Sequence, residues 1–346
     1  MIYIIILIIA VILVLIIYIL IGLVLVIEFD HKLFGKRTND PDNPCYLTFE
    51  DFKDKMVRCP YHTYYYGKRI NGYIYQASNV ETFKGFVILS HGMFGTHIQY
   101  MLDINLMCEN GYKVLAFDNY GCGISEGKST VGLSNGIYCL ENVIESVYKE
   151  NINDDLPVFL YGHSWGGYSA LGAAKRYSNI RGVISRSAPI SPVFAESDLL
   201  FYFNHKLYSA YKPFINLIIK LVLPKRMKIN CISGVKRNKN TKFLILYAKN
   251  DQLIKIKHSA AFYFENHPLS RVEVAYSEYG LHNSIVDESG TKNYIMLVKK
   301  YNEIISKENH EEELKKFVDN LDKKSLYFCQ AEVSQKIIDF LDENSK

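Results

Sequence analysis

The chain has 346 residues, with 40 basic and 36 acidic side chains and a formal net charge of +4. Because these charges nearly balance and no basic stripe is interleaved with aromatic residues, nucleic acid is excluded as an expected partner. The length suits one large α/β domain with additional segments.

The first 27 residues contain no charged side chain and consist mainly of Ile, Leu, Val and Tyr. About 20 such residues in a helix span a bilayer, so residues 1–27 predict a transmembrane anchor. A cleaved signal peptide would have a basic start, a shorter apolar core and a small-residue cleavage site, which this stretch lacks. Lys32, Lys36 and Arg37 follow the span, and by the positive-inside rule they predict that the domain beyond it faces the cytoplasm.

Residues 28–82 are expected to form a linker followed by a β segment at the leading edge of a sheet. The first part of this interval is rich in Asn, Asp and Pro, a composition typical of a turn-rich linker. A short helix opened by Thr48 is predicted within residues 46–58. The tyrosine-rich residues 61–76 predict a β-hairpin.

From residue 83 to residue 346, short apolar segments alternate with helix-like segments. Strands are predicted over 86–90, 113–117, 158–161, 182–185, 242–248 and 272–277, and helices over 98–110, 133–150, 168–177, 258–265 and 331–341. This alternation predicts one α/β domain with a mostly parallel sheet and helices on both faces. In such sheets, chemistry collects at the carboxyl ends of the strands.

Two stretches interrupt the alternation. Residues 191–240 lie between two strands, are rich in aromatic residues and contain an apolar helix-like run at 215–223. A cap over the site is expected here, and an additional packing layer is a second interpretation that is compatible with a cap. Residues 307–324 are highly charged, with acidic and basic residues at i,i+4 spacing, and they predict a solvated helical face.

The predicted strand at 158–161 leads into Gly162-His163-Ser164-Trp165-Gly166-Gly167 and then into a helix-like stretch. A strand, a Gly-x-Ser-x-Gly motif and a helix in this order are the context of a nucleophile elbow. The sharp turn holds the serine hydroxyl clear of the sheet, and the glycines keep side chains out of the crowded strand–helix junction. Ser164 is therefore the candidate nucleophile, while His163 is expected only to pack.

A serine hydroxyl needs a base to take its proton and a third group to orient that base. In this architecture the acid follows a later strand and the histidine follows the last strand. Asp251 comes after the predicted strand 242–248, and His282 comes after the predicted strand 272–277. They are the candidate acid and base, with Asp287 as a rival acid whose alternative role is a helix N-cap.

A tetrahedral intermediate also needs two N–H donors directed at its oxyanion. One donor is expected from Trp165, the residue after the candidate nucleophile. The other is expected from the loop after the strand at 86–90, where Gly92 lets the backbone approach closely. Met93 is the candidate donor in that loop.

Taken together, these segments resemble the α/β-hydrolase superfamily, and within it the lysophospholipase and monoacylglycerol lipase branch with its serine aminopeptidase relatives. The matching segments are His91-Gly92-Met93-Phe94-Gly95, Asp118-Asn119-Tyr120-Gly121-Cys122-Gly123-Ile124-Ser125, Gly162 to Gly167, Ser187-Ala188-Pro189, and the loops of Asp251 and His282. The resemblance implies an α/β-hydrolase fold and a structural turn at Asp118 beside the site. Residues 287–330 look longer than the corresponding stretch of that family.

The leading expectation is a serine hydrolase that cleaves a carboxylic ester through an acyl-enzyme. A lipid-derived ester is favoured because an anchor and an apolar cap would both place the site near a bilayer. Peptide or amide hydrolysis and acyl transfer are alternatives on the same fold, and a membrane-tethered binding protein without turnover is an alternative of another class. No cofactor or metal is expected, because the His and Cys positions show no ligand spacing.

Overall fold

The computed structural model describes residues 1–225, 228–323 and 329–346. Its strands form one eight-stranded sheet in the order β1-β2-β4-β3-β5-β6-β7-β8. They are β1 (Met56–Tyr65), β2 (Lys68–Ala77), β3 (Gly85–Ser90), β4 (Tyr112–Phe117), β5 (Val158–His163), β6 (Gly182–Arg186), β7 (Lys242–Ala248) and β8 (Val272–Ser277). β1 and β2 form the predicted hairpin at the sheet edge, and all pairs from β4 to β8 are parallel.

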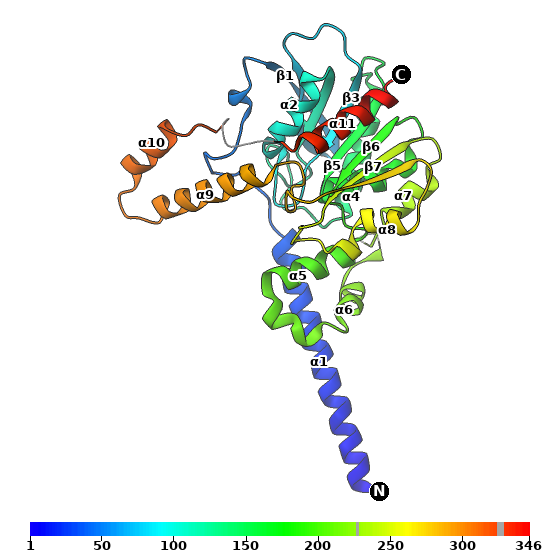
Figure 1. The fold of residues 1–346 in the computed structure, drawn as a ribbon. Coiled ribbons are helices and arrows are strands. Elements are labelled where there is room, and N and C mark those ends of the chain that lie inside the picture. Colours follow the sequence, from blue (N-terminus) through cyan, green and yellow to red (C-terminus); the bar gives the residue numbers. More distant parts are fainter. Residues whose placement is uncertain (226–227, 324–328) are drawn as a thin grey trace.

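Helices cover both faces of this sheet (Figure 1). The α-helices of the described residues are α1 (Ile2–Phe34), α2 (Met101–Glu109), α3 (Asn135–Lys149), α4 (Trp165–Ala173), α5 (Pro192–Tyr208), α6 (Ile215–Val222), α7 (Ile232–Arg237), α8 (Ala260–Asn266), α9 (Glu288–Ile305), α10 (Glu311–Asp319) and α11 (Ala331–Asn344). Apolar residues of α2 and α11 share one core with the sheet, and those of α3, α4 and α8 share another. β3, β5 and β6 are buried at every position because both of their faces are covered. The predicted α/β architecture is confirmed.

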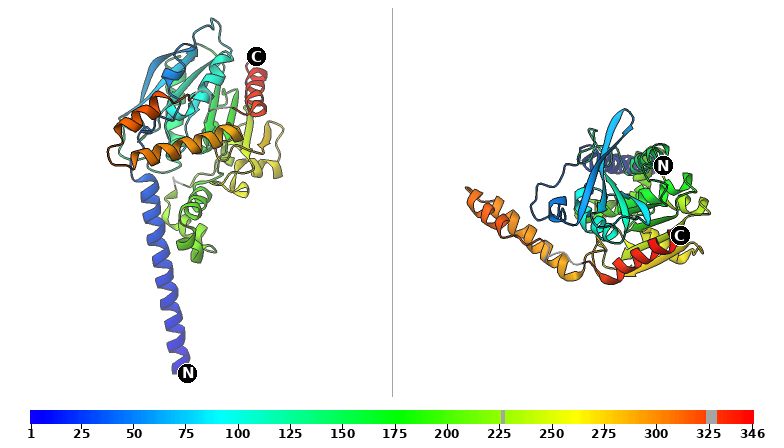
Figure 2. Two further views of the ribbon diagram at one scale, coloured as in Figure 1. Left: turned by 60° about the vertical axis from the view of Figure 1, so that its left-hand side comes forward. Right: turned by 90° about the horizontal axis from the view of Figure 1, so that it is seen from above.

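α1 projects from the body of the protein, with the N-terminus at its far end (Figures 1 and 2). Nearly all residues from Ile2 to Leu20 are exposed, whereas Gly22, Val26 and Phe29 are buried. By length and composition, α1 is long and apolar enough to cross a membrane. The stretch predicted as an anchor is therefore the outer part of a longer helix, and the inner part of that helix belongs to the protein core.

α6, within the interval 191–240, packs against α1 and against α5 (Figure 1). The ring of Tyr18 stacks on Tyr211 with 4.5 Å between centroids, and its hydroxyl donates to the carbonyl of Ala210 at 2.6 Å. A Cβ at Gly22 would lie 2.8 Å from the Ile218 side chain, so the close contact between α1 and α6 depends on this glycine. Residues 226–227 of the predicted cap lie outside the described residues.

Glu196 on α5 is 1% exposed, and among the described residues its Oε2 has no hydrogen-bond partner. Burial, together with the charge of Asp30, raises the pKa of Glu196 well above its ordinary value. The folded protein therefore keeps Glu196 protonated at pH values where the unfolded chain ionises it. This raised pKa makes the contribution of Glu196 to the free energy of unfolding depend on pH. The contribution is fully present below about pH 4.3, the pKa of the unfolded chain. It is lost at about 1.4 kcal/mol per pH unit as the pH rises toward the pKa of Glu196 in the folded protein.

We accordingly expect Glu196→Gln, which cannot ionise, to raise the thermal unfolding midpoint at pH 8 more than at pH 5. Thermal unfolding of the detergent-solubilised chain at both pH values measures this difference. Glu308→Gln is the matched control, because Glu308 is exposed. A shift of the midpoint that is equal at the two pH values would contradict the prediction.

The short helix predicted within residues 46–58, opened by Thr48, is a 3₁₀ helix at Phe49–Asp51. It starts with a capping box in which Asp51 accepts from the Thr48 amide at 2.7 Å. From Met56 onward the chain pairs with β2 instead, with Met56 opposite Ala77. Thr48 therefore starts a helix, but that helix is short because the chain from Met56 onward belongs to β1.

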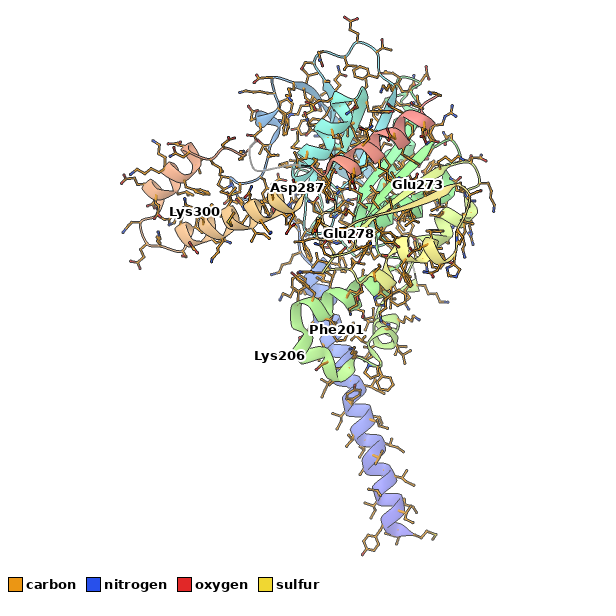
Figure 3. The ribbon with its side chains drawn as sticks, in the orientation of Figure 1. Phe201, Lys206, Glu273, Glu278, Asp287 and Lys300 are labelled. Carbon is orange, nitrogen blue, oxygen red and sulfur yellow. The ribbon has the colours of Figure 1, made fainter. Side chains whose placement is uncertain are left out.

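α9 and α10, within residues 287–330, extend to one side of the body (Figure 1). Figure 3 labels Asp287 at the start of α9 and Lys300 farther along it. Apolar residues of the two helices pack around Cys45, and the Tyr301 hydroxyl donates to the carbonyl of Asp42 at 2.8 Å. The charged stretch predicted as a solvated face holds α10, which is mostly exposed; residues 324–328 lie outside the described residues.

Candidate active site

Ser164 occupies the turn between β5 and α4 and has a left-handed backbone, with φ 54° and ψ −114°. Such a conformation is strained for a residue with a side chain and persists only where its surroundings hold it. A Cβ at Gly166 would lie 1.8 Å from the carbonyl oxygen of Ser90, and one at Gly162 would lie 2.3 Å from the Gly166 backbone. These two glycines let strand and helix cross closely enough to form the elbow.

The structure brings Ser164, Asp251 and His282 into one hydrogen-bonded line, although they follow three different strands. Nε2 of His282 lies 2.7 Å from Oγ of Ser164, and Nδ1 lies 2.8 Å from Oδ2 of Asp251. The other carboxylate oxygen accepts from the amides of Leu253 and Ile254 at 2.8 and 3.1 Å. An ionised carboxylate only accepts, so Nδ1 carries the proton and Nε2 is free to accept from Ser164.

Asp287, the rival acid, lies at the N-terminus of α9 instead. Its Oδ1 accepts from the amide of Gly290 at 2.6 Å, so it caps the helix. The structure therefore shows Asp287 as the N-cap of α9, the alternative role predicted for it.

Met93 and Trp165, the two candidate oxyanion donors, line the same cavity as Ser164 and His282. Trp165 is the first residue of α4, and the first N–H groups of a helix have no partner within the helix. Its indole donates to the carbonyl of Leu133 at 2.6 Å, which fixes the ring. Met93 and Trp165 therefore remain the candidate oxyanion donors beside Ser164.

The loop before Met93 is held by buried polar contacts. His91 accepts from the Asn119 amide through Nε2 at 3.0 Å, and its Nδ1 lies 2.7 Å from the carbonyl of Gly92. Burial lowers the pKa of His91, in keeping with a neutral ring that donates from one nitrogen and accepts at the other. Asp118 accepts from the amides of His97 and Ile124 at 2.7 and 2.9 Å. These two hydrogen bonds hold the turn at Asp118 that the resemblance implies.

The interpretation of His163 as a packing residue is incomplete. Its Nε2 lies 2.8 Å from the carbonyl oxygen of His282, and its Nδ1 lies 2.8 Å from the hydroxyl of Tyr100. Asp103 and Arg186, which were not among the residues predicted from the sequence, form a buried ion pair with 2.5 Å between Nη2 and Oδ1. An arginine at the end of the short predicted strand 182–185 is the signal that could have identified this pair.

Ser164 and His282 open into a cavity of about 490 Å³, a size typical of small-molecule sites. Apolar residues dominate its lining, and they come from three directions. The loop after β3 supplies Met93 and Phe94, α5 supplies Leu199 and Phe203, and α9 supplies Ile295. α5, within the predicted cap interval, therefore forms one wall, and α9, whose sequence gave no functional indication, forms another.

Residues 81–233 match the family model described as "Serine aminopeptidase, S33". A proline iminopeptidase of Thermoplasma volcanium is 34% identical over 113 residues, which are 32% of this chain and 37% of that protein. A monoglyceride lipase of Saccharomyces cerevisiae is 30% identical over 151 residues, 41% of this chain and 44% of that enzyme. These matches span less than half the length of either relative.

Solved structures agree in fold over a larger share of the chain. An esterase of Pyrococcus furiosus superposes with a TM-score of 0.57 at 18% identity, covering 90% of this chain and 99% of that one. A soluble variant of the Saccharomyces cerevisiae monoglyceride lipase superposes with a TM-score of 0.52 at 17% identity, covering 84% and 96% of the two chains.

The protein thus has the α/β-hydrolase fold, as expected from its sequence. The S33 model and the monoglyceride lipase match are in keeping with the lipase-like resemblance of the sequence.

Proposed function

We propose that this protein is a serine hydrolase that cleaves carboxylic esters, with lipid-derived esters as its substrate class. The observation that carries the proposal is the pair of hydrogen bonds that join Ser164 to His282 and His282 to Asp251. Ser164 and His282 line an apolar cavity. The relatives and structural neighbours, named as esterases, lipases and peptidases, support the reaction class.

In this mechanism Oγ of Ser164 attacks the ester carbonyl while Nε2 of His282 takes the hydroxyl proton. Asp251 orients the ring and stabilises the imidazolium, and the N–H groups of Met93 and Trp165 stabilise the oxyanion. The imidazolium then gives its proton to the leaving alkoxide as the C–O bond breaks. Water, deprotonated by the same ring, attacks the acyl-enzyme and releases the carboxylic acid and the free serine.

The surroundings of the cavity support a lipid-derived substrate. α1 is proposed to anchor the chain in a membrane, and its inner part packs in the core beside α6. α6 and the residue before it expose Phe214, Leu217 and Leu221. Residues 206–225 of the proposed cap also expose four lysines: Lys206 (labelled in Figure 3), Lys212, Lys220 and Lys225. A segment that exposes both apolar and lysine side chains suits the surface of an anionic bilayer, so the cap would lie at the lipid headgroups.

The proposal also includes the side of the membrane on which the catalytic domain lies and the bounds of the anchor and of that domain. Lys32 and Lys36 follow the exposed segment of α1 and favour a cytoplasmic location of the catalytic domain. Arg37 is left out of this orientation argument because its side chain binds within the folded domain. Its Nη1 donates to the carbonyls of Ser125 and Gly127 at 2.7 and 3.2 Å. We propose residues 1–27 as the anchor and residues 83–346 as the hydrolase domain.

Peptide hydrolysis is the second candidate, because the S33 model and the proline iminopeptidase match this chain. An aminopeptidase needs a carboxylate that receives the α-ammonium group of its substrate. Among the described residues that line the cavity, Asp103 alone carries a carboxylate, and it is paired with Arg186. This pairing favours the ester over the peptide.

The full-length chain in phosphatidylcholine vesicles tests the choice between ester and peptide. We expect hydrolysis of a monoacylglycerol in the same vesicles and of p-nitrophenyl esters, with kcat/KM rising by about fourfold per methylene as the acyl chain fills the cavity. Proline p-nitroanilide should be a poor substrate. Faster cleavage of the anilide than of every ester would establish the peptidase alternative instead.

A further inference from the structure

The loop that carries His282 between β8 and α9 has a strained backbone. Leu281 and Ser284, on either side of His282, have positive φ angles of 49° and 58°, and Gly280 has a φ of 110°. For a residue with a side chain, a left-handed backbone is unfavourable because the side chain crowds the neighbouring carbonyl. Such strain persists only where the surrounding structure holds it. The position of His282 therefore depends on contacts that hold the loop in place.

Two buried side chains from the ends of neighbouring strands hold consecutive carbonyls of this loop. His163 ends β5 and Arg186 ends β6, and they are register partners in the sheet. Nε2 of His163 lies 2.8 Å from the carbonyl oxygen of His282, and Nη1 of Arg186 donates to the carbonyl of Asn283. Both residues are buried, His163 at 8% exposure and Arg186 at 0%.

The hydrogen bonds of His163 fix its tautomer. The amide of Gly92 donates to the Tyr100 hydroxyl at 2.7 Å, and that hydroxyl lies 2.8 Å from Nδ1 of His163. A carbonyl can only accept, so Nε2 carries the hydrogen that reaches His282, and Nδ1 accepts from Tyr100. Burial, with the neighbouring His282 and Arg186, lowers the pKa of His163 well below its ordinary value, which keeps this ring neutral. One chain of hydrogen bonds thus joins Gly92, in the loop after β3, to the loop that carries His282.

Arg186 is held in turn by a buried acid. Its Nη2 lies 2.5 Å from Oδ1 of Asp103, and the Tyr161 hydroxyl donates to the same oxygen. Nη1 is left to contact the His282 loop, where it also lies 3.5 Å from Oγ of Ser284. A planar guanidinium can bind Asp103 and the Asn283 carbonyl at once, which a lysine ammonium cannot reproduce.

We propose that His163 and Arg186 are positioning residues that set the place of His282 relative to Ser164 by binding the carbonyls of residues 282 and 283. This inference rests on the proposed function of Ser164 and His282. His282 is 2.7 Å from Ser164 only as long as its loop keeps this position. A displacement of about 1 Å in a reacting group can cost about 100-fold in rate.

Three variants of the full-length chain test the proposal. His163→Phe removes both ring hydrogen bonds, whereas His163→Gln can donate to the His282 carbonyl through its amide nitrogen and accept from Tyr100 through its oxygen. Arg186→Lys keeps a positive charge beside Asp103 but loses the second contact. We expect His163→Phe and Arg186→Lys to lower kcat for p-nitrophenyl butyrate by about 10- to 100-fold, and His163→Gln to recover most of the loss. KM should stay within about twofold, because the affected interaction is made in the transition state.

A second readout does not depend on turnover. The Nδ1 proton shared by His282 and Asp251 gives a downfield proton NMR signal, which should weaken in His163→Phe and return in His163→Gln. The proposal is overturned if His163→Phe keeps the wild-type kcat and signal, or if His163→Gln loses both as fully as His163→Phe. If the wild-type chain has no hydrolase activity, the proposed function fails, while the signal in the three variants still decides whether the two residues position the ring.

Discussion

Ser164→Ala is expected to lower kcat for p-nitrophenyl butyrate on the order of 10⁶-fold. The variant keeps the cavity, His282 and the oxyanion donors but loses the only oxygen that lies 2.7 Å from Nε2 of His282 among the described contacts of that atom. Its remaining activity would come from binding and from the oxyanion donors acting on water. Steady-state kinetics of the full-length chain in vesicles measures the effect.

Ser289→Ala is the control for this prediction, because Ser289 is an exposed serine on α9. It should hydrolyse the ester at the wild-type rate. Activity of Ser164→Ala within tenfold of that control would mean that another group carries the reaction.

The second large effect is expected for Asp251→Asn, which should lower kcat on the order of 10⁴-fold. Oδ1 of Asp251 accepts two backbone amides, from Leu253 and Ile254. An asparagine would keep its oxygen there and turn its NH₂ group toward Nδ1 of His282. Nδ1 would then have to accept, the ring hydrogen would move to Nε2, and His282 could no longer take the proton of Ser164.

Asp287→Asn provides the comparison, since Asp287 caps α9 and asparagine is an equally good N-cap. It should retain the wild-type kcat and unfolding midpoint. If Asp287→Asn lost activity while Asp251→Asn kept it, the rival acid would be the functional one. Kinetics and thermal unfolding of the two variants, measured side by side, distinguish these results.

Much of the fold follows from patterns that are local in the sequence. The segments that form β3 and β5 hold short, uninterrupted apolar runs, which is typical of strands covered on both faces. The candidate residues could be named because each follows a strand, and parallel strands end at one edge of the sheet. Ser164 and His282 lie 118 residues apart in the sequence, yet that rule alone predicts that they are close.

The contacts that position the site could not be predicted in this way. The bond from His163 to the His282 carbonyl depends on the path of an irregular loop with two left-handed residues, which no periodic pattern encodes. The pairing of Arg186 with Asp103 crosses from β6 to α2 through the core. Likewise, α9 forms a cavity wall because of where it leaves the His282 loop, and its own composition indicates only an amphipathic helix.

The most direct test of the central claim is the reaction of the full-length chain with a fluorophosphonate, followed by mass spectrometry of its peptides. An activated serine attacks phosphorus and displaces fluoride, so we expect a single phosphonyl adduct on Ser164. We expect no adduct in Ser164→Ala and a sharply reduced rate in His282→Ala. A folded wild-type chain in vesicles that does not react, or an adduct on another residue, would contradict the assignment of Ser164 as the nucleophile.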